Sequence, residues 1–133
     1  MKEYFPEIKE IKYEGPESKN VMAFKYYNKD EVIGGKPMRE HLKFAMSYWH
    51  TLKAQGLDMF GGDTMDRAWN RYDDALEQAK ARADAGFEFM QKIGMDYFCF
   101  HDRDIINEAM TLTETNRLLD EIVDHIEGLM KKT

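Results

Sequence analysis

Two stretches of the chain place apolar residues three or four positions apart, the spacing that puts them on one face of a helix. The first stretch begins near Asp74, and Glu77 follows three residues later, as in an N-terminal capping box. Its apolar face is formed by Leu76, Ala79, Ala83, Phe87 and Met90. Gly94 follows as the glycine expected just past the end of a helix.

The second amphipathic stretch begins near Thr111, where Glu114 again gives the capping-box spacing. Its predicted buried stripe consists of Leu119, Ile122, Val123, Ile126 and Met130. Each of the two helices needs a partner that covers its apolar face, and a sheet is the partner that this arrangement favours.

Apolar runs before each helix predict the strands of that sheet. Residues 95–100 are short, aromatic and almost continuously apolar, which predicts a strand buried on both faces, as in a parallel sheet. In residues 42–49, alternation predicts another strand, with Phe44, Met46 and Tyr48 as its apolar positions. Residues 38–41 predict one helical turn, and residues 20–27 carry a weaker strand pattern. The order strand, loop, helix occurs twice, so the chain is predicted to be an α/β protein containing two successive β/α units.

Residues 1–35 show neither period and are punctuated by proline and glycine, so we expect an N-terminal arm there and the β/α units in residues 36–133. The arm carries several large apolar residues, which predicts that it wraps another surface; they are Phe5, Ile8, Ile11, Phe24 and Tyr26. Residues 51–69 are rich in Gly, Asp and Met and predict a long loop with one turn of helix. Loops of that length in compact domains are often functional.

Composition and charge exclude several classes of function. The formal net charge is −6, and no stripe of Lys and Arg offsets it, so we expect no nucleic-acid partner. No apolar run is long enough to span a membrane, and residues 1–7 lack the apolar core of a signal peptide, so we expect a cytoplasmic protein without membrane contact. The single cysteine, Cys99, excludes an internal disulfide framework.

His101 and Asp104 follow directly after the predicted strand that ends at Phe100. Ligands of β/α proteins bind at the carboxyl ends of parallel strands, where the loops converge. At this spacing the carboxylate can accept a hydrogen bond from imidazole Nδ1, which leaves Nε2 facing a pocket for acid–base work. A pair that serves structure alone fits the spacing equally well.

Three further aromatic residues are candidates for binding or packing. Trp49 follows the earlier strand and could stack on a sugar, although its spacing favours a cap on the core. Phe60 lies between glycines and acids in the long loop, where insertion into another chain and local packing are equally open. We expect Trp69 to belong to the core or an interface.

We predict no metal site in this chain. The acidic clusters are better explained as a helix cap, a partner for His101 and a solvated helix face. The other histidines, His41, His50 and His125, have no Cys or His partners at zinc spacing, and His125 is expected beside the exposed face of the second helix. No phosphate-binding loop, dinucleotide fingerprint or nucleophile elbow is present.

Several segments in order resemble the longer, class II form of the xylose isomerase family. The resemblance runs through the whole chain and is most specific in its last segment; the segments are YFPEI (4–8), AFKYY (23–27), EVIGGKPM (31–38), HLKF (41–44), YWHT (48–51), RAWNR (67–71) and YFCFHDRD (97–104).

The resemblance implies a fold, an activity and roles for single residues. The fold would be an N-terminal arm plus the first two β/α units of a TIM (β/α)₈ barrel, hence a partial barrel. The activity would be interconversion of xylose with xylulose and of glucose with fructose, by a metal-assisted hydride shift after ring opening. His101 would assist ring opening, with Asp104 holding its imidazole. Trp49 would shield the aldose, and Phe60 would enter the pocket of a neighbouring subunit in a homotetramer.

The family uses two divalent cations, such as Mg²⁺, Mn²⁺ or Co²⁺, whose ligands lie on later strands than the two predicted here. The catalytic lysine of the family lies there too. We therefore expect residues 1–133 to act as a truncated part that holds no metal and is inactive by itself. The alternative function is a non-catalytic interaction module, which associates with itself or with intact isomerase subunits through the arm and the Phe60 loop.

Overall fold

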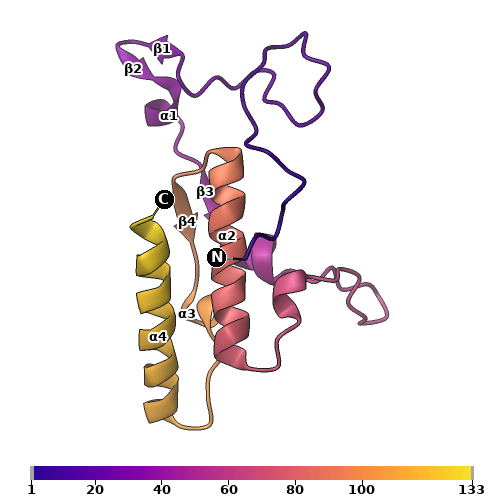
Figure 1. Ribbon diagram of the computed structural model, residues 1–133, viewed down its shortest axis with the longest axis vertical. Coiled ribbons are helices and arrows are strands. Elements are labelled where there is room, and N and C mark those ends of the chain that lie inside the picture. Colours follow the sequence, from indigo (N-terminus) through magenta and orange to yellow (C-terminus); the bar gives the residue numbers. More distant parts are fainter. Residues whose placement is uncertain (1, 133) are drawn as a thin grey trace.

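The computed structural model describes residues 2–132, which form two long helices beside a two-stranded parallel sheet (Figure 1). The elements follow one another along the chain as β1 (Val32–Ile33), β2 (Lys36–Pro37), α1 (Met38–His41), β3 (Ala45–Ser47), a π-helical turn (Trp49–Lys53), a 3₁₀ turn (Ala68–Asn70), α2 (Ala75–Ile93), β4 (Tyr97–Cys99), α3 (Asp102–Ile105) and α4 (Leu112–Met130). The helical turn predicted for residues 38–41 is therefore present as α1.

Helix α2 begins and ends where its sequence signals predict. The Asp74 carboxylate accepts a hydrogen bond from the Glu77 backbone N–H, which satisfies one of the amides left free at a helix start. Gly94 ends the helix with a φ of 71°, in the left-handed region that glycine adopts without a steric penalty. All five residues of the predicted apolar face are buried, so this helix is confirmed in bounds and orientation.

Helix α4 has the predicted start but not the whole predicted stripe. The Thr111 hydroxyl accepts a hydrogen bond from the Glu114 backbone N–H, as expected. The buried side chains on the helix are Thr115, Ile122, Ile126 and Leu129. Val123 is 41% exposed and Met130 is 56% exposed, so the prediction was wrong for both. The apolar stripe of α4 is wider than the strip that α2 covers, and these two residues lie on its uncovered side.

The strand pair is parallel, with Met46 beside Phe98 in the register. The element order β3, α2, β4, α4 and the parallel pairing of the strands match the order of elements that the sequence predicts. The expected burial of residues 95–100 on both faces is wrong, because Tyr97 is 46% exposed and Phe100 is also exposed. Within residues 2–132 the sheet has only these two strands, so part of β4 has no neighbour to cover it.

The N-terminal arm docks on α2 of its own chain at one end and forms a hairpin near the other. The weak strand pattern of residues 20–27 gives only a single bridge, between Tyr13 and Phe24. The hairpin joins β1 to β2 through Gly34 and Gly35, whose φ angles of 58° and 83° suit a tight two-residue turn. The sequence pattern predicts no hairpin here, because the two glycines indicate a break in regular structure without specifying which strands pair.

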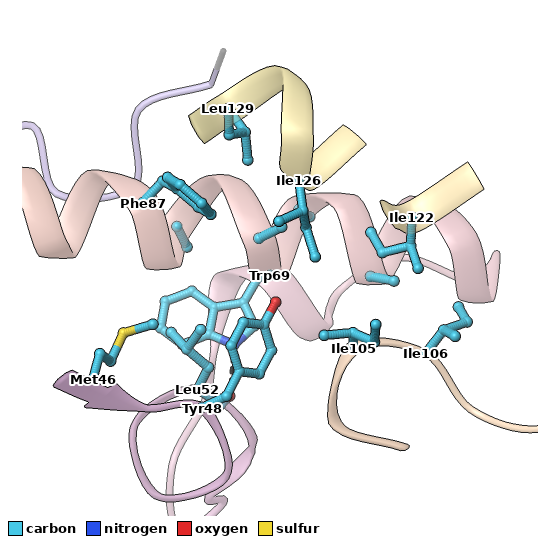
Figure 2. Packing of buried hydrophobic residues seen from close by; sticks show 14 of the residues in the cluster. Met46, Tyr48, Leu52, Trp69, Phe87, Ile105, Ile106, Ile122, Ile126 and Leu129 are labelled. Carbon is cyan, nitrogen blue, oxygen red and sulfur yellow. Dashed lines mark hydrogen bonds between the residues drawn. The ribbon is translucent and has the colours of Figure 1, made fainter. Parts of the chain in front are cut away.

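The core lies on both sides of α2 (Figure 2). On one side it packs against the buried isoleucines and leucine of α4, and on the other against Met46, Tyr48 and Leu52. Trp69 is buried there and its indole N–H donates to the Leu52 carbonyl at 2.9 Å, which confirms its core role. No helix in the described part of the chain is long and apolar enough to cross a membrane.

Candidate functional site

The His101–Asp104 pair forms at the start of α3, immediately beyond the end of β4. Imidazole Nδ1 of His101 lies 2.9 Å from Asp104 Oδ2, and the His101 backbone N–H donates to the same oxygen at 2.8 Å. Asp104 is only 8% exposed, whereas the His101 side chain is open to solvent. A carboxylate oxygen that accepts a hydrogen bond from imidazole Nδ1 favours the tautomer with the proton on Nδ1, which leaves Nε2 as the nitrogen with a free lone pair.

Trp49 lies against this histidine. It begins the π-helical turn that follows β3, and its indole is half-buried rather than enclosed in the core. The ring centroids of Trp49 and His101 are 4.6 Å apart and the planes are tilted by 43°. Parallel pairing of β3 and β4 brings the two residues to the same end of the sheet, although 52 positions separate them in sequence. The fold thus places the polar imidazole of His101 beside the flat, apolar indole of Trp49.

Phe60 belongs to the segment between the π-helical turn and the 3₁₀ turn, which projects from the body of the molecule (Figure 1). The Asp58 carboxylate accepts the Phe60 and Gly62 backbone N–H groups, at 2.8 Å and 3.3 Å, and so shapes the loop tip. The Phe60 ring is 87% exposed, and it packs on no other aromatic ring among residues 2–132. Local packing does not account for this side chain.

Curated relatives match almost the whole chain, although no family model matches it. The xylose isomerase of Thermotoga neapolitana is 53% identical over 131 residues, which are 98% of this chain and 30% of that protein. The xylose isomerase of Thermoanaerobacter sp. (strain X514) is 53% identical over 129 residues, or 97% of this chain and 30% of that protein. This chain belongs to the xylose isomerase family. It spans about 30% of the length of these relatives and corresponds to the N-terminal portion of such an enzyme.

Two positively charged side chains that the sequence pattern did not indicate, Arg82 and Lys53, contact the backbone of α3 in this xylose isomerase portion. Arg82 of α2 is 7% exposed, and its Nη1 donates to the Asp104 carbonyl at 3.4 Å. Lys53 Nζ donates to the Arg103 carbonyl at 2.7 Å. Burial lowers the pKa of both side chains from the ordinary values. A signal existed for Arg82, because it lies three residues after Ala79 on the apolar face of the predicted helix.

Tyr48 adds a buried hydroxyl to the same region. Its side chain is almost fully enclosed, and its hydroxyl has no hydrogen-bond partner among the described residues. Burial raises the pKa of Tyr48 well above its usual value, so the phenol stays neutral throughout the physiological range. It is a structural group of the core, not an acid or base for this site.

His125 departs from its predicted position. Its Nε2 lies 2.9 Å from Asp84 Oδ1 of α2, and both side chains are largely buried between the two helices. The expectation that it lies beside the exposed face of its helix was therefore wrong. Its ring points toward α2 because it follows Ile122 by three positions on the face that packs there.

Proposed function

We propose that this chain supplies the ring-opening part of the sugar site in an aldose–ketose isomerase, a xylose isomerase acting on D-xylose and also on D-glucose. The observation that carries the proposal is the juxtaposition of Trp49 with the hydrogen-bonded pair of His101 and Asp104. A flat apolar surface beside an oriented imidazole suits a sugar, whose C–H faces are apolar and whose oxygens exchange protons.

In this proposal His101 moves the proton that opens the sugar ring. Asp104 fixes the tautomer, so that Nε2 takes the proton of the anomeric hydroxyl while the bond between C1 and the ring oxygen breaks. The electron pair of that bond goes to the ring oxygen, which receives the proton, and C1 becomes the aldehyde carbon. Trp49 keeps water from one side of the sugar and limits its orientations.

The metal chemistry of the family is not assigned to this chain. The resemblance implies two divalent cations (Mg²⁺, Mn²⁺ or Co²⁺) in the complete enzyme. Residues 2–132 contain no group of three or more His, Cys, Asp and Glu side chains that could hold such an ion. The side chains of residues 2–132 therefore do not fit a metal centre.

The same proposal includes the architecture and assembly of the complete enzyme. In it β3 and β4 are the first two strands of a TIM barrel, residues 1–35 form its N-terminal arm, and residues 36–133 contain its first two β/α units. Phe60 enters the pocket of a neighbouring subunit in a tetramer. Its exposed position on a shaped loop supports this role.

A chimaera tests the proposed site. The 131 matched residues of this chain replace the corresponding segment of the Thermotoga neapolitana xylose isomerase, and turnover of xylose is measured with Mg²⁺. We expect an active chimaera whose kcat falls about 100-fold with His101→Asn, because general acid–base catalysis contributes that much or more. The matched control is His41→Asn, at an exposed histidine whose Nε2 lies 2.9 Å from the Ile33 carbonyl oxygen, and it should keep kcat within about twofold. An active chimaera unaffected by His101→Asn contradicts the proposal.

Residues 1–133 by themselves are expected to be inactive. The purified chain incubated with Mg²⁺ and xylose should give no xylulose above a protein-free blank, because residues 2–132 contain no group of side chains that could hold a cation to polarise the open sugar. Turnover that copurifies with the chain and disappears in His101→Asn would contradict this expectation.

A second candidate function is a non-catalytic interaction module, and the exposed Phe60 loop favours it. Met59 and Phe60 are both almost fully exposed at the loop tip, which is unusual for large apolar side chains unless they meet a partner. Size-exclusion chromatography of the chain, alone and mixed with an intact relative, tests it. Association that is lost in Phe60→Ser, without any sugar turnover in the chimaera, would favour the module over the enzyme.

A further inference from the structure

Helix α3 is a single turn that cannot be stable through its own hydrogen bonds. It comprises four residues, Asp102–Ile105, whereas isolated helices need about 12 or more residues even with favourable sequences. Its start is closed by the Asp104 carboxylate, which accepts the His101 backbone N–H. Its last carbonyls have too few intrahelical partners and must find donors elsewhere.

Two positively charged side chains, from two different elements, supply those donors. Lys53 Nζ, at the end of the turn after β3, donates to the Arg103 carbonyl at 2.7 Å. Arg82 Nη1, from the middle of α2, donates to the Asp104 carbonyl at 3.4 Å. The consecutive carbonyls of Arg103 and Asp104 thus each accept a hydrogen bond from a positively charged side chain, at the helix end where positive charge is favourable.

The Arg82 guanidinium is itself held in a fixed orientation. Its Nη2 donates to Asn70 Oδ1 at 3.3 Å and to Gln78 Oε1 at 3.1 Å. A buried guanidinium with several acceptors has little freedom, so it presents Nη1 to one place only. A buried positive charge also needs a negative charge nearby, and Asp104 is a buried acid whose charge interacts with it.

We propose that Arg82 and Lys53 are positioning residues that clamp α3 and thereby set the geometry of the His101–Asp104 hydrogen bond. The inference deepens the proposed function and rests on it, since the geometry matters for ring opening only if His101 acts there. Arg82, through its hydrogen bond to the Asp104 carbonyl, fixes the distance between α3 and α2. Lys53 ties the turn after β4 to the turn after β3, which carries Trp49, and so fixes the spacing of the two rings.

The test reads the His101 ring directly, by ¹⁵N NMR of histidine-labelled chain at about pH 8, where an ordinary histidine is neutral. The unmodified chain should show the proton on Nδ1. Lys53→Met and Arg82→Lys should each shift the two ring-nitrogen signals toward those of a free imidazole, in which the two neutral tautomers are mixed. Lys53→Arg keeps a positively charged donor and should give the signals of the unmodified chain. The backbone amide of Ile106, which donates to Asp102, should exchange about fivefold faster in Lys53→Met.

Lys80→Met is the matched control, because the Lys80 ammonium pairs with Glu77 of the same helix and with no other acid among residues 2–132. It should leave both readouts unchanged. Folding of each variant is checked by circular dichroism; if Arg82→Lys unfolds, the half-buried Lys53 carries the test, since that variant loses one donor from the protein surface.

Unchanged ring signals in folded Lys53→Met overturn the clamp, and so does an unmodified chain whose His101 shows the unrestrained pattern. A merely structural lysine would change the melting temperature without changing the tautomer. Because the readout uses no sugar, the clamp can fail while the chimaera remains active, and the proposed function can fail while the clamp holds.

Discussion

Gly86 lies in the middle of α2, where a glycine normally weakens a helix. A Cβ placed there would lie 2.7 Å from Leu52 Cδ1 and 3.3 Å from Met46 Cε, and both side chains are buried. Gly86→Ala should therefore lower the free energy of unfolding by about 1 kcal/mol, since the overpacking exceeds the gain in helix propensity. The measurement is urea unfolding followed by circular dichroism.

Gly128 of α4 provides the matched control, because a Cβ there meets nothing within 4 Å. Gly128→Ala should raise the free energy of unfolding by about 0.5–1 kcal/mol. Equal effects at the two glycines would show that Leu52 moves aside freely and that the close packing at Gly86 carries no cost.

Glu88 makes the docking of the N-terminal arm depend on pH. Its carboxylate accepts the Tyr4 and Phe5 backbone N–H groups at 2.6 and 2.9 Å and lies 2.7 Å from Lys92 Nζ. Burial alone would raise the pKa of Glu88, but Lys92 and the two amides hold it below its usual value. The ionised Glu88 carboxylate thus stabilises the folded chain fully above its ordinary pKa of 4.5. This contribution to the free energy of unfolding is lost as the pH falls through the lowered pKa of the folded state.

Glu88→Gln should lower the free energy of unfolding by about 1–2 kcal/mol at pH 7 and flatten its decline between about pH 5 and 3. Urea unfolding at each pH measures both effects. Glu77→Gln, at an exposed residue of the same helix, is the control and should keep the slope of the unmodified chain. A Glu88→Gln variant with that same slope would contradict the assignment.

At the scale of elements, the two long helices are joined by one polar pair as well as by apolar packing. Asp84 of α2 and His125 of α4 approach to 2.9 Å within a largely apolar interface. A double-mutant cycle with Asp84→Ala and His125→Ala should give a coupling energy of about 1 kcal/mol, because a partly buried, charge-assisted hydrogen bond is lost. If the changes in free energy of unfolding of the two single variants simply add up in the double variant, the pair has no coupling energy and only orients the side chains.

At the scale of the whole molecule, an apolar groove of about 430 Å³ remains open between β4 and α4. It is lined by exposed parts of Tyr97, Phe100, Val123 and Met130. Contiguous apolar surface of this kind promotes association. Val123→Glu should reduce concentration-dependent aggregation in light scattering, with the free energy of unfolding changed by less than about 0.5 kcal/mol. Scattering that stays unchanged would locate the association elsewhere, with the Phe60 loop as the next surface to substitute.

Local signals in the sequence determined where the two long helices begin and where α2 ends. Asp74, Thr111 and Gly94 act through hydrogen bonds and backbone angles that involve only nearby residues, so their effects can be predicted without the fold. The spacing of His101 and Asp104 likewise sufficed to predict their hydrogen bond, because three residues in a turn bring the groups together.

Only the tertiary structure decided which apolar residues are covered and which distant groups meet. Val123 is as apolar as Ile122, yet its exposure depends on where α2 lies against α4. Trp49 meets His101, and Lys53 and Arg82 meet the carbonyls of α3, only because parallel strands bring separate loops to one end of the sheet. Such contacts depend on the relative placement of whole elements, which no local pattern encodes.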